Sequence, residues 1–307
     1  MRKAFSTTLA ELAQRDDRIM LLTGDLGFMA LEPFADRFPE RFINVGVAEQ
    51  NMVGLGTGLA ESGFIPFLYS IATFASMRAY EFIRNGPIMH DLPVRIVGVG
   101  GGFEYGPAGP THYGLEDLGL MRIQPGITVI APADHQQMRT ALLESWDLPR
   151  PIYYRVGKDD RTIVPGLDGR FELGRAAVIG TGRDILFITM GAIAGEVLAA
   201  VETLAQRQVG CTTVVVSSFN PDPTEDLLEA LSRFPLAVTV EAHYREGGLG
   251  SMVAELIADN GLRCKTVRCG VGTTPSGLTG SQAYLQERHG LSRRALLQTA
   301  LQLLVEA

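Results

Sequence analysis

The segment Asn44-Val45-Gly46-Val47-Ala48-Glu49-Gln50-Asn51-Met52 joins a short apolar run to the beginning of an amphipathic helix. The run at 43–45 predicts a strand, and the helix is expected over about 48–61, with Gly63 ending it. Pro66 in the next apolar run suggests that this strand is irregular or lies at an edge of its sheet. Apolar runs and helical stretches alternate in this way along almost the whole chain, which is typical of α/β architecture with largely parallel sheets.

Two such α/β units are predicted, separated by a segment of different composition. Residues 161–182 carry charges, Pro165 and several glycines, and their apolar stretches are short, as at Val178-Ile179. We interpret this segment as a linker with room for one strand. The expected fold is therefore two α/β domains, residues 1–160 and 183–307, each with a largely parallel sheet flanked by helices.

The composition fits a folded globular protein better than a nucleic-acid-binding or membrane protein. The chain has 307 residues, 46% of them hydrophobic and 20% charged, as in globular proteins. A net charge of −7 argues against binding to phosphates, and the longest apolar runs, such as 185–188, are too short to span a membrane. Cys211, Cys264 and Cys269 form no C-x-x-C pair. We therefore expect reduced thiols in a cytoplasmic protein, and no metal site on this chain.

Glu49 is the first candidate for chemistry. A carboxylate in the first turn of a helix is stabilised by the positive helix terminus, which is the ordinary interpretation. However, Gly46, Gly54, Gly56 and Gly58 surround it in the sequence, and glycines let other groups approach the backbone closely. The alternative is that Glu49 faces a pocket, where it could share a proton with a ligand nitrogen.

The second candidate is the glycine-rich loop at 98–114, which contains His112. Phe103 stands where a G-x-G-x-x-G motif needs its third glycine, so a dinucleotide-binding loop is rejected. A loop of this composition after a buried strand instead suits an active-site wall at the carboxyl end of a parallel sheet. His112 is then either a structural hydrogen-bonding group or a catalytic one.

Aromatic residues and arginines supply further candidates. Phe74, Met77 and Tyr80 recur near helical spacing, which indicates either a core stripe or the wall of a site. Arg78, Arg84 and Arg155 are candidate anion contacts, although single arginines are more often solvated or in ion pairs.

Taken together these motifs resemble the transketolase family over essentially the whole chain. The segment Gly46-Val47-Ala48-Glu49-Gln50-Asn51-Met52 looks like the family segment that holds the cofactor-activating glutamate. Gly109-Pro110-Thr111-His112 is similar to the family's active-site loop, and Ala72-Thr73-Phe74 to the run that opens the aromatic cofactor wall. Val240-Glu241 and Gly247-Gly248-Leu249-Gly250-Ser251 look like the C-terminal domain. The resemblance makes residues 1–160 a pyrimidine-binding domain and residues 183–307 a transketolase C-terminal domain.

The resemblance also implies roles for individual residues around thiamine diphosphate. Glu49 would bond the pyrimidine nitrogen of the cofactor and Phe74, with Met77 as the alternative, would stack on the ring. His112 would contact donor oxygens as a catalytic and substrate-binding residue. Arg155 would hold a substrate phosphate, and Asp25 would lie near the cofactor.

Part of the family pattern is absent from this sequence. Full-length members bind the diphosphate through a metal held by a Gly-Asp-Gly segment and a later Asn, and Gly24-Asp25-Leu26 does not supply that ligand set. A separate N-terminal subunit, expected to be encoded by an adjacent gene, would therefore carry the diphosphate and its Mg²⁺ or Ca²⁺. Because family active sites straddle subunits, we expect a hetero-oligomer, with a dimer of this chain inside an α2β2 assembly.

Two departures bear on the substrate. The aspartate that precedes Gly-Pro-Thr-His in sugar-phosphate members is replaced by Ala108, and Gly100 stands where a phosphate-binding histidine is expected. The physiological donor is therefore expected to differ from the usual ketose phosphates.

The leading hypothesis is a split transketolase-like transferase that moves a two-carbon ketol unit from a ketose-type donor to an aldehyde acceptor. The alternatives are the β-subunit of a 2-oxo acid dehydrogenase, a 1-deoxyxylulose-phosphate-synthase-like carboligase, and a paralogue without activity.

Overall fold

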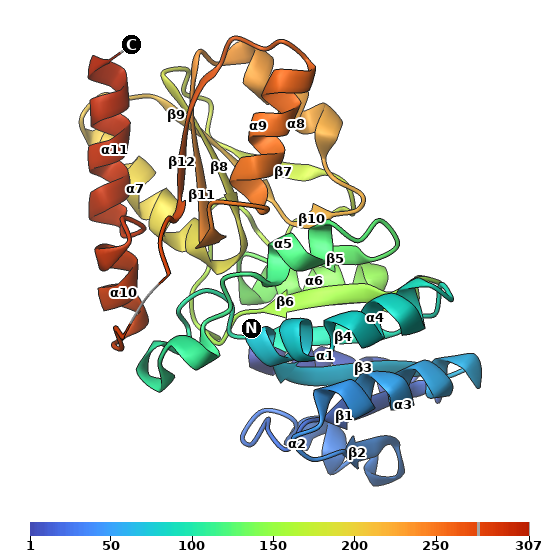
Figure 1. Ribbon diagram of the computed structural model, residues 1–307. Coiled ribbons are helices and arrows are strands. Elements are labelled where there is room, and N and C mark those ends of the chain that lie inside the picture. Colours follow the sequence, from blue (N-terminus) through green and yellow to red (C-terminus); the bar gives the residue numbers. More distant parts are fainter. Residues whose placement is uncertain (275–276, 307) are drawn as a thin grey trace.

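The computed structural model describes residues 1–274 and 277–306. Its strands form a seven-stranded and a five-stranded sheet, and Figure 1 shows helices packed against both. The prediction of an α/β fold with two largely parallel, helix-flanked sheets is confirmed. No helix among these residues has both the length and the apolar character needed to cross a bilayer.

The first sheet has the strand order β10-β5-β6-β4-β3-β1-β2. All of its pairs are parallel except the one between β10 and β5. Its strands are β1 (Ile19–Thr23), β2 (Phe42–Asn44), β3 (Ile65–Ile71), β4 (Arg95–Val99), β5 (Thr128–Ile130), β6 (Ile152–Val156) and β10 (Ser218–Phe219).

The position of Pro66 corrects an expectation. Strand β3 lies inside the sheet, between β1 and β4, and Pro66 pairs with Met20. The suggestion of an edge strand is therefore wrong. Pro66 is the second residue of the strand, where the loss of one N–H leaves the rest of the ladder intact.

Helices cover both faces of the first sheet. On one face, α1 and α6 pack together over alternate strand residues such as Leu21 and Phe67. On the other, α3 and the following helical turns pack over the intervening residues, such as Leu22 and Leu68. The helical elements of this half are α1 (Arg2–Ala13), α2 (Glu32–Ala35), η1 (Pro39–Arg41), α3 (Glu49–Glu61), η2 (Phe74–Arg78), α4 (Tyr80–Ile83), η3 (Arg84–Ile88), η4 (Gly106–Ala108), η5 (Pro110–His112), α5 (Asp117–Arg122) and α6 (His135–Ser145).

The second sheet has the order β12-β11-β8-β9-β7, with only β7 antiparallel to its neighbour. Strand β7 comes from within the expected linker, so that segment is partly built into this sheet. The elements are β7 (Ala176–Ile179), β8 (Ile185–Met190), η6 (Gly191–Ile193), α7 (Ala194–Gln206), β9 (Cys211–Val216), α8 (Thr224–Arg233), β11 (Leu236–Tyr244), α9 (Leu249–Asp259), β12 (Lys265–Val271), α10 (Gln282–Arg288) and α11 (Arg293–Val305). Ser292 caps α11 as predicted, since its hydroxyl accepts the Ala295 N–H at 3.3 Å.

The two halves share a polar contact as well as apolar core. Strand β10, which follows β9 of the second sheet, pairs with β5 at the edge of the first. Near the same boundary the Gly119 N–H, in α5, donates to Nε2 of the buried His243 at 3.1 Å. Burial lowers the pKa of His243, so the neutral ring is favoured and can accept this bond.

Glu241 makes stability depend on pH in a direction unusual for a carboxylate. It is 1% exposed, and its oxygens accept the Leu249 and Gly250 N–H groups at 2.8 Å each. Burial raises the pKa of Glu241 to about 7, although those two backbone bonds oppose the shift. The folded chain therefore holds this proton more tightly than the unfolded chain, so the group's contribution to stability falls as pH rises towards about 7.

We expect the melting temperature of the wild-type chain to fall, relative to that of Glu241→Gln, between pH 5 and pH 8. The variant removes the titrating carboxyl, so the comparison isolates this group. Glu229→Gln, on the exposed surface of α8, is the control and should show no such trend. A wild-type chain that gains on Glu241→Gln as pH rises would contradict this account.

Candidate active site

The candidate site lies at the carboxyl ends of parallel strands of the first sheet. Glu49 opens α3 just after β2, Ser70 lies near the end of β3, and Arg78 ends the π-helical turn η2 that follows β3. His112 belongs to the loop after β4. Ligands of open α/β sheets bind in this position, and π-helical turns are frequent at functional sites.

Glu49 is buried and its two carboxylate oxygens are bonded separately. The side chain is 2% exposed. Oε1 accepts the Ser70 hydroxyl at 3.0 Å, and Oε2 accepts from Nη1 of Arg78 at 3.0 Å. A Cβ on Gly24 would come within 3.5 Å of Oε1, so the backbone at Gly24 lies directly against the carboxylate. Glu49 is thus no solvated first-turn acid.

Arg78, Phe74 and His112 continue from Glu49 in one series of contacts. The Arg78 guanidinium carbon lies 4.0 Å from the centre of the Phe74 ring, in a cation–π contact. The His112 ring meets the Phe74 ring edge to face, with 5.1 Å between centres. Nδ1 of His112 is 2.9 Å from the Thr111 hydroxyl. The structure therefore brings together three residues singled out in the sequence, namely Glu49, Phe74 and His112.

Asp25 and Met77 lie at the margin of this group. Asp25 is exposed, with a φ of 58°, and its carboxylate accepts the Asn44 side-chain amide at 2.9 Å. Asn44 in turn accepts the Gly46 N–H at 3.0 Å, so this pair orders the loop that leads to Glu49. Met77 is 44% exposed on the same turn as Phe74. Their contact with cofactor stays a prediction.

Arg155 is occupied by bonds within the protein. Its side chain is 7% exposed, and Nε lies 2.9 Å from Asp117 Oδ2 without the linear geometry of a hydrogen bond. Nη2 donates to Asp117 Oδ1 at 3.0 Å and to the Gly114 and Ala242 carbonyls at 2.6 and 3.0 Å. A phosphate-binding role for Arg155 stays a prediction, and it would compete with this buried ion pair.

The two departures in the loop have different structural settings. Ala108 is exposed, so a longer side chain has room there. Gly100 has a φ of +77°, and a Cβ there would come within 2.2 Å of the Tyr105 ring. A histidine at Gly100 would need both a strained backbone and a displaced Tyr105. Tyr105 therefore occupies the space in which that side chain would lie.

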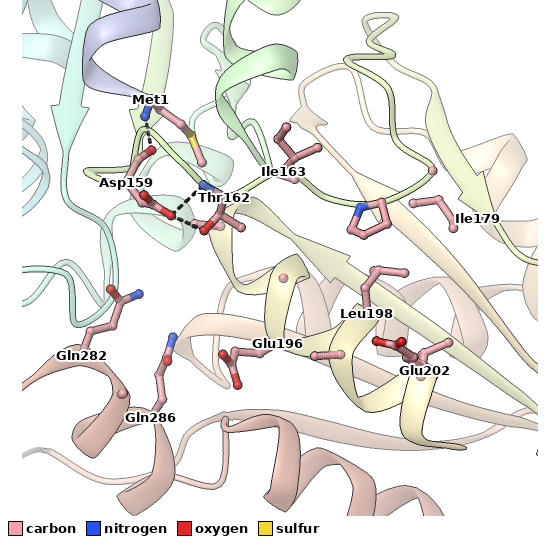
Figure 2. Close-up of a pocket in the computed structure, with 18 of the residues that line it drawn as sticks. Met1, Asp159, Thr162, Ile163, Ile179, Glu196, Leu198, Glu202, Gln282 and Gln286 are labelled. Atoms are coloured by element: carbon pink, nitrogen blue, oxygen red, sulfur yellow. Dashed lines mark hydrogen bonds between the residues drawn. The ribbon is translucent and has the colours of Figure 1, made fainter. Parts of the chain in front are cut away.

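Two cavities differ in how close they lie to these residues. One, of about 650 Å³, is lined by residues 47–51 and by Arg78, and so opens directly on Glu49. A larger cleft of about 880 Å³ lies between the two halves (Figure 2). Two of its carboxylates are already engaged: Asp159 accepts the Thr162 N–H at 3.1 Å, and Glu196 accepts the Arg293 N–H at 2.7 Å. The smaller cavity is the candidate site.

Sequence reasoning missed Ser70 and Asp117, which bond the buried charged groups of Glu49 and Arg155, respectively. The sequence marks Ser70 only as part of a strand, and it does not mark Asp117 at all. Strand periodicity could have placed Ser70 on the face of α3, but nothing local indicates that Asp117 is the partner of Arg155, 38 residues later. Within the described residues, no group of three or more His, Cys, Asp or Glu side chains could hold a metal ion.

Comparisons with known proteins identify the family of both halves. Residues 1–160 match the transketolase pyrimidine-binding domain family, and residues 174–296 match the transketolase C-terminal domain family. A 6-deoxy-6-sulfo-D-fructose transketolase subunit of Clostridium sp. is 33% identical over 98% of this chain and 93% of its own length. One of the subunits of an apulose-4-phosphate transketolase from Phocaeicola vulgatus is 32% identical over 98% of this chain and 96% of its own.

Solved structures show the same arrangement. A split-gene transketolase, described as an inactive β4 tetramer, superimposes with a TM-score of 0.89 at 33% identity, over 99% of this chain and 98% of that one. A transketolase from Leishmania mexicana shares the fold, with a TM-score of 0.83 at 20% identity. The match covers 99% of this chain but 45% of the Leishmania chain, so the present chain corresponds in length to less than half of that protein.

Proposed function

The chain belongs to the transketolase family, and on that premise we propose that Glu49, Phe74 and His112 form its half of a thiamine-diphosphate site. The chain is a subunit of a two-component transketolase-like transferase. The observation that carries the site assignment is the buried Glu49 carboxylate, 2% exposed, which opens on a cavity of about 650 Å³. Glu49 opens a helix, and Phe74 and His112 lie on short helical turns, so regular backbone positions all three groups.

The residues present fit the pyrimidine half of the cofactor. The Glu49 carboxylate is a buried acceptor, 2% exposed, and in such surroundings proton sharing with a ring nitrogen is strong. The Phe74 ring, already stacked on a planar cation at 4.0 Å, offers a face to a flat heterocycle. When bound, thiamine diphosphate supplies a carbon nucleophile that accepts and releases a two-carbon ketol unit.

Each residue of this chain has a separate task in that reaction. Glu49 holds a proton at the pyrimidine nitrogen, and the Ser70 hydroxyl, 3.0 Å from Oε1, fixes the carboxylate orientation. Phe74 orients the ring. His112 contacts donor oxygens from the loop that packs against Phe74, and Thr111, 2.9 Å from its Nδ1, orients the ring through that nitrogen.

A second subunit is proposed to supply the diphosphate and metal ligands. The described residues offer no group of metal ligands of their own, and the relatives named above are themselves called transketolase subunits. Phe28, Met29 and Val47 are exposed by 77%, 94% and 70%, respectively. Val47 lines the Glu49 cavity, and exposed apolar side chains of this size suit burial by another chain.

We further propose that two copies of this chain meet within an α2β2 assembly. The outer side of α3 carries Gly54, Leu55 and Gly58, all exposed, and a Cβ on either glycine would meet nothing within 4 Å. Glycines four residues apart leave a smooth helix face on which a second helix can pack closely. At Gly56, by contrast, an added Cβ would come within 2.8 Å of Leu68, so that side of α3 packs against the described part of this chain.

The donor is proposed to be a ketose-type compound that the site binds through other contacts than those made to the common ketose phosphates. Ala108 lacks a group to bond a donor hydroxyl, and Tyr105 fills the space beside Gly100. Two relatives are named for unusual ketoses, a sulfo-sugar and apulose 4-phosphate. These names concern those proteins and indicate only that this subunit type accommodates varied donors.

Calorimetry tests the proposed half-site. Titration of thiamine diphosphate and Mg²⁺ into the free chain should show no tight binding, because the diphosphate is the part of the cofactor with most charge to neutralise. The same titration into the complex with the diphosphate-binding subunit should give a dissociation constant lower by at least about a hundredfold, equivalent to roughly 2.7 kcal/mol. Tight binding to the free chain would refute the half-enzyme assignment.

A further inference from the structure

Arg78 makes the two contacts that the proposed function assigns to the cofactor ring. Its Nη1 donates to Glu49 Oε2 at 3.0 Å, and its guanidinium carbon lies 4.0 Å from the centre of the Phe74 ring. A guanidinium is a flat, delocalised cation that bonds carboxylates at its edge and stacks on aromatic rings by its face. A protonated aminopyrimidine has the same two properties.

Those two contacts leave little alternative space for a ring. The other Glu49 oxygen accepts the Ser70 hydroxyl at 3.0 Å. The His112 ring also packs against Phe74, with 5.1 Å between the ring centres. A heterocycle that bonds Glu49 and stacks on Phe74 at the same time must therefore enter the volume that Arg78 now fills.

We infer that the Arg78 guanidinium holds the place of the pyrimidine ring in the free subunit and must be displaced before the cofactor binds. This inference rests on the proposed function. The pair also explains how the free chain tolerates a buried carboxylate, since Glu49 is 2% exposed and would otherwise lack a counter-charge. Arg78 thus competes with the cofactor ring for Glu49 and Phe74, and it stabilises the free subunit.

The arginine is free to move. Its side chain is 45% exposed, while that of Glu49 is not, and it lies at the end of a five-residue π-helical turn. A rotation about its side-chain bonds can carry the head group into solvent without disturbing the sheet. Because Arg78 is half exposed, solvent screens its ion pair with Glu49, and a ligand that makes the same two contacts can displace it.

Arg78→Met is the test variant, because it keeps the apolar stem and removes the flat cation. In the complex with the diphosphate-binding subunit, we expect it to bind thiamine diphosphate about tenfold more tightly than the wild type in calorimetry. Plain electrostatics predicts the opposite sign, since the cofactor is an anion and the variant loses a positive charge. Arg84→Met, which removes an exposed cation that does not bond Glu49, measures that general effect and should bind equally or more weakly.

Two further measurements separate the possible failures. Free Arg78→Met chain should melt at a lower temperature than free Arg84→Met chain, because Glu49 has lost its counter-charge. If Arg78→Met does not fold, Arg78→Lys replaces it in the test. Arg78→Lys keeps the charge without the flat head group, and it should bind the cofactor more tightly than the wild type but by less than tenfold. Equal or weaker cofactor binding by folded Arg78→Met, or by Arg78→Lys, overturns the inference.

The proposed function has its own control in the same titration. Phe74→Ala should weaken cofactor binding if the ring stacks there. If Phe74→Ala weakens binding but Arg78→Met does not tighten it, only the displacement by Arg78 is wrong. If neither variant changes the affinity, the site assignment itself fails.

Discussion

Replacing Glu49 by glutamine is expected to slow proton exchange at the reactive cofactor carbon by about 10²–10⁴-fold in the complete complex. Glutamine has the size and shape of glutamate and can still accept the Ser70 hydroxyl, which lies 3.0 Å from Oε1. It cannot share a proton with a ring nitrogen as a carboxylate does, because its amide is neither an anion nor a base. The loss therefore falls on the chemistry and not on the shape of the site.

Exchange of that carbon-bound proton for solvent deuterium, followed by nuclear magnetic resonance, measures this step without a substrate. Glu61→Gln is the matched control, because Glu61 ends the same helix and is exposed. It should exchange at the wild-type rate. An exchange rate for Glu49→Gln within about threefold of the wild type would remove Glu49 from the mechanism.

The fold could be predicted from this sequence because its signals are local. Apolar runs and helical periodicity indicate both α/β units, and the Ser292 cap is readable from one side chain. What escaped prediction depends on distant pairings. Strand β10 follows a strand of the second sheet but pairs with β5 of the first. It is only two residues long, and so short a stretch of sequence does not indicate which strand it pairs with. The edge position suggested by Pro66 was wrong because the sequence shows that one N–H is missing but not that β1 and β4 lie on either side of the strand.

The site was predictable to the same extent. Glu49 and His112 are marked by their neighbours in the sequence, and their position at strand ends follows from the parallel topology. The Glu49–Arg78 bond joins residues 29 apart, and only folding brings the two side chains together. Arg155 shows the limit most clearly. The family resemblance implies a phosphate ligand, and only the structure shows that its guanidinium is also bonded within the protein, by groups as far away as Ala242.

That pairing leads to the largest expected effect on stability. Asp117 is buried, with its side chain 0% exposed, and it is the only carboxylate bonded to Arg155 among the described residues. It also accepts the Tyr153 hydroxyl at 2.8 Å. Asp117→Asn keeps the volume but leaves the Arg155 cation buried without a counter-charge. We expect a loss of roughly 3–5 kcal/mol in the free energy of unfolding, measured by urea denaturation.

Two variants show whether the pair itself is responsible. Glu229→Gln breaks an ion pair with Arg233 in which both side chains are at least 60% exposed, and should cost no more than about 0.5 kcal/mol. The double variant Asp117→Asn with Arg155→Met should recover part of the loss, because it removes the unpaired cation and fills the space with an apolar side chain. If Asp117→Asn instead unfolds at the wild-type urea concentration, the guanidinium does not depend on Asp117. Arg155 would then be free to bind a substrate phosphate, as the family resemblance implied.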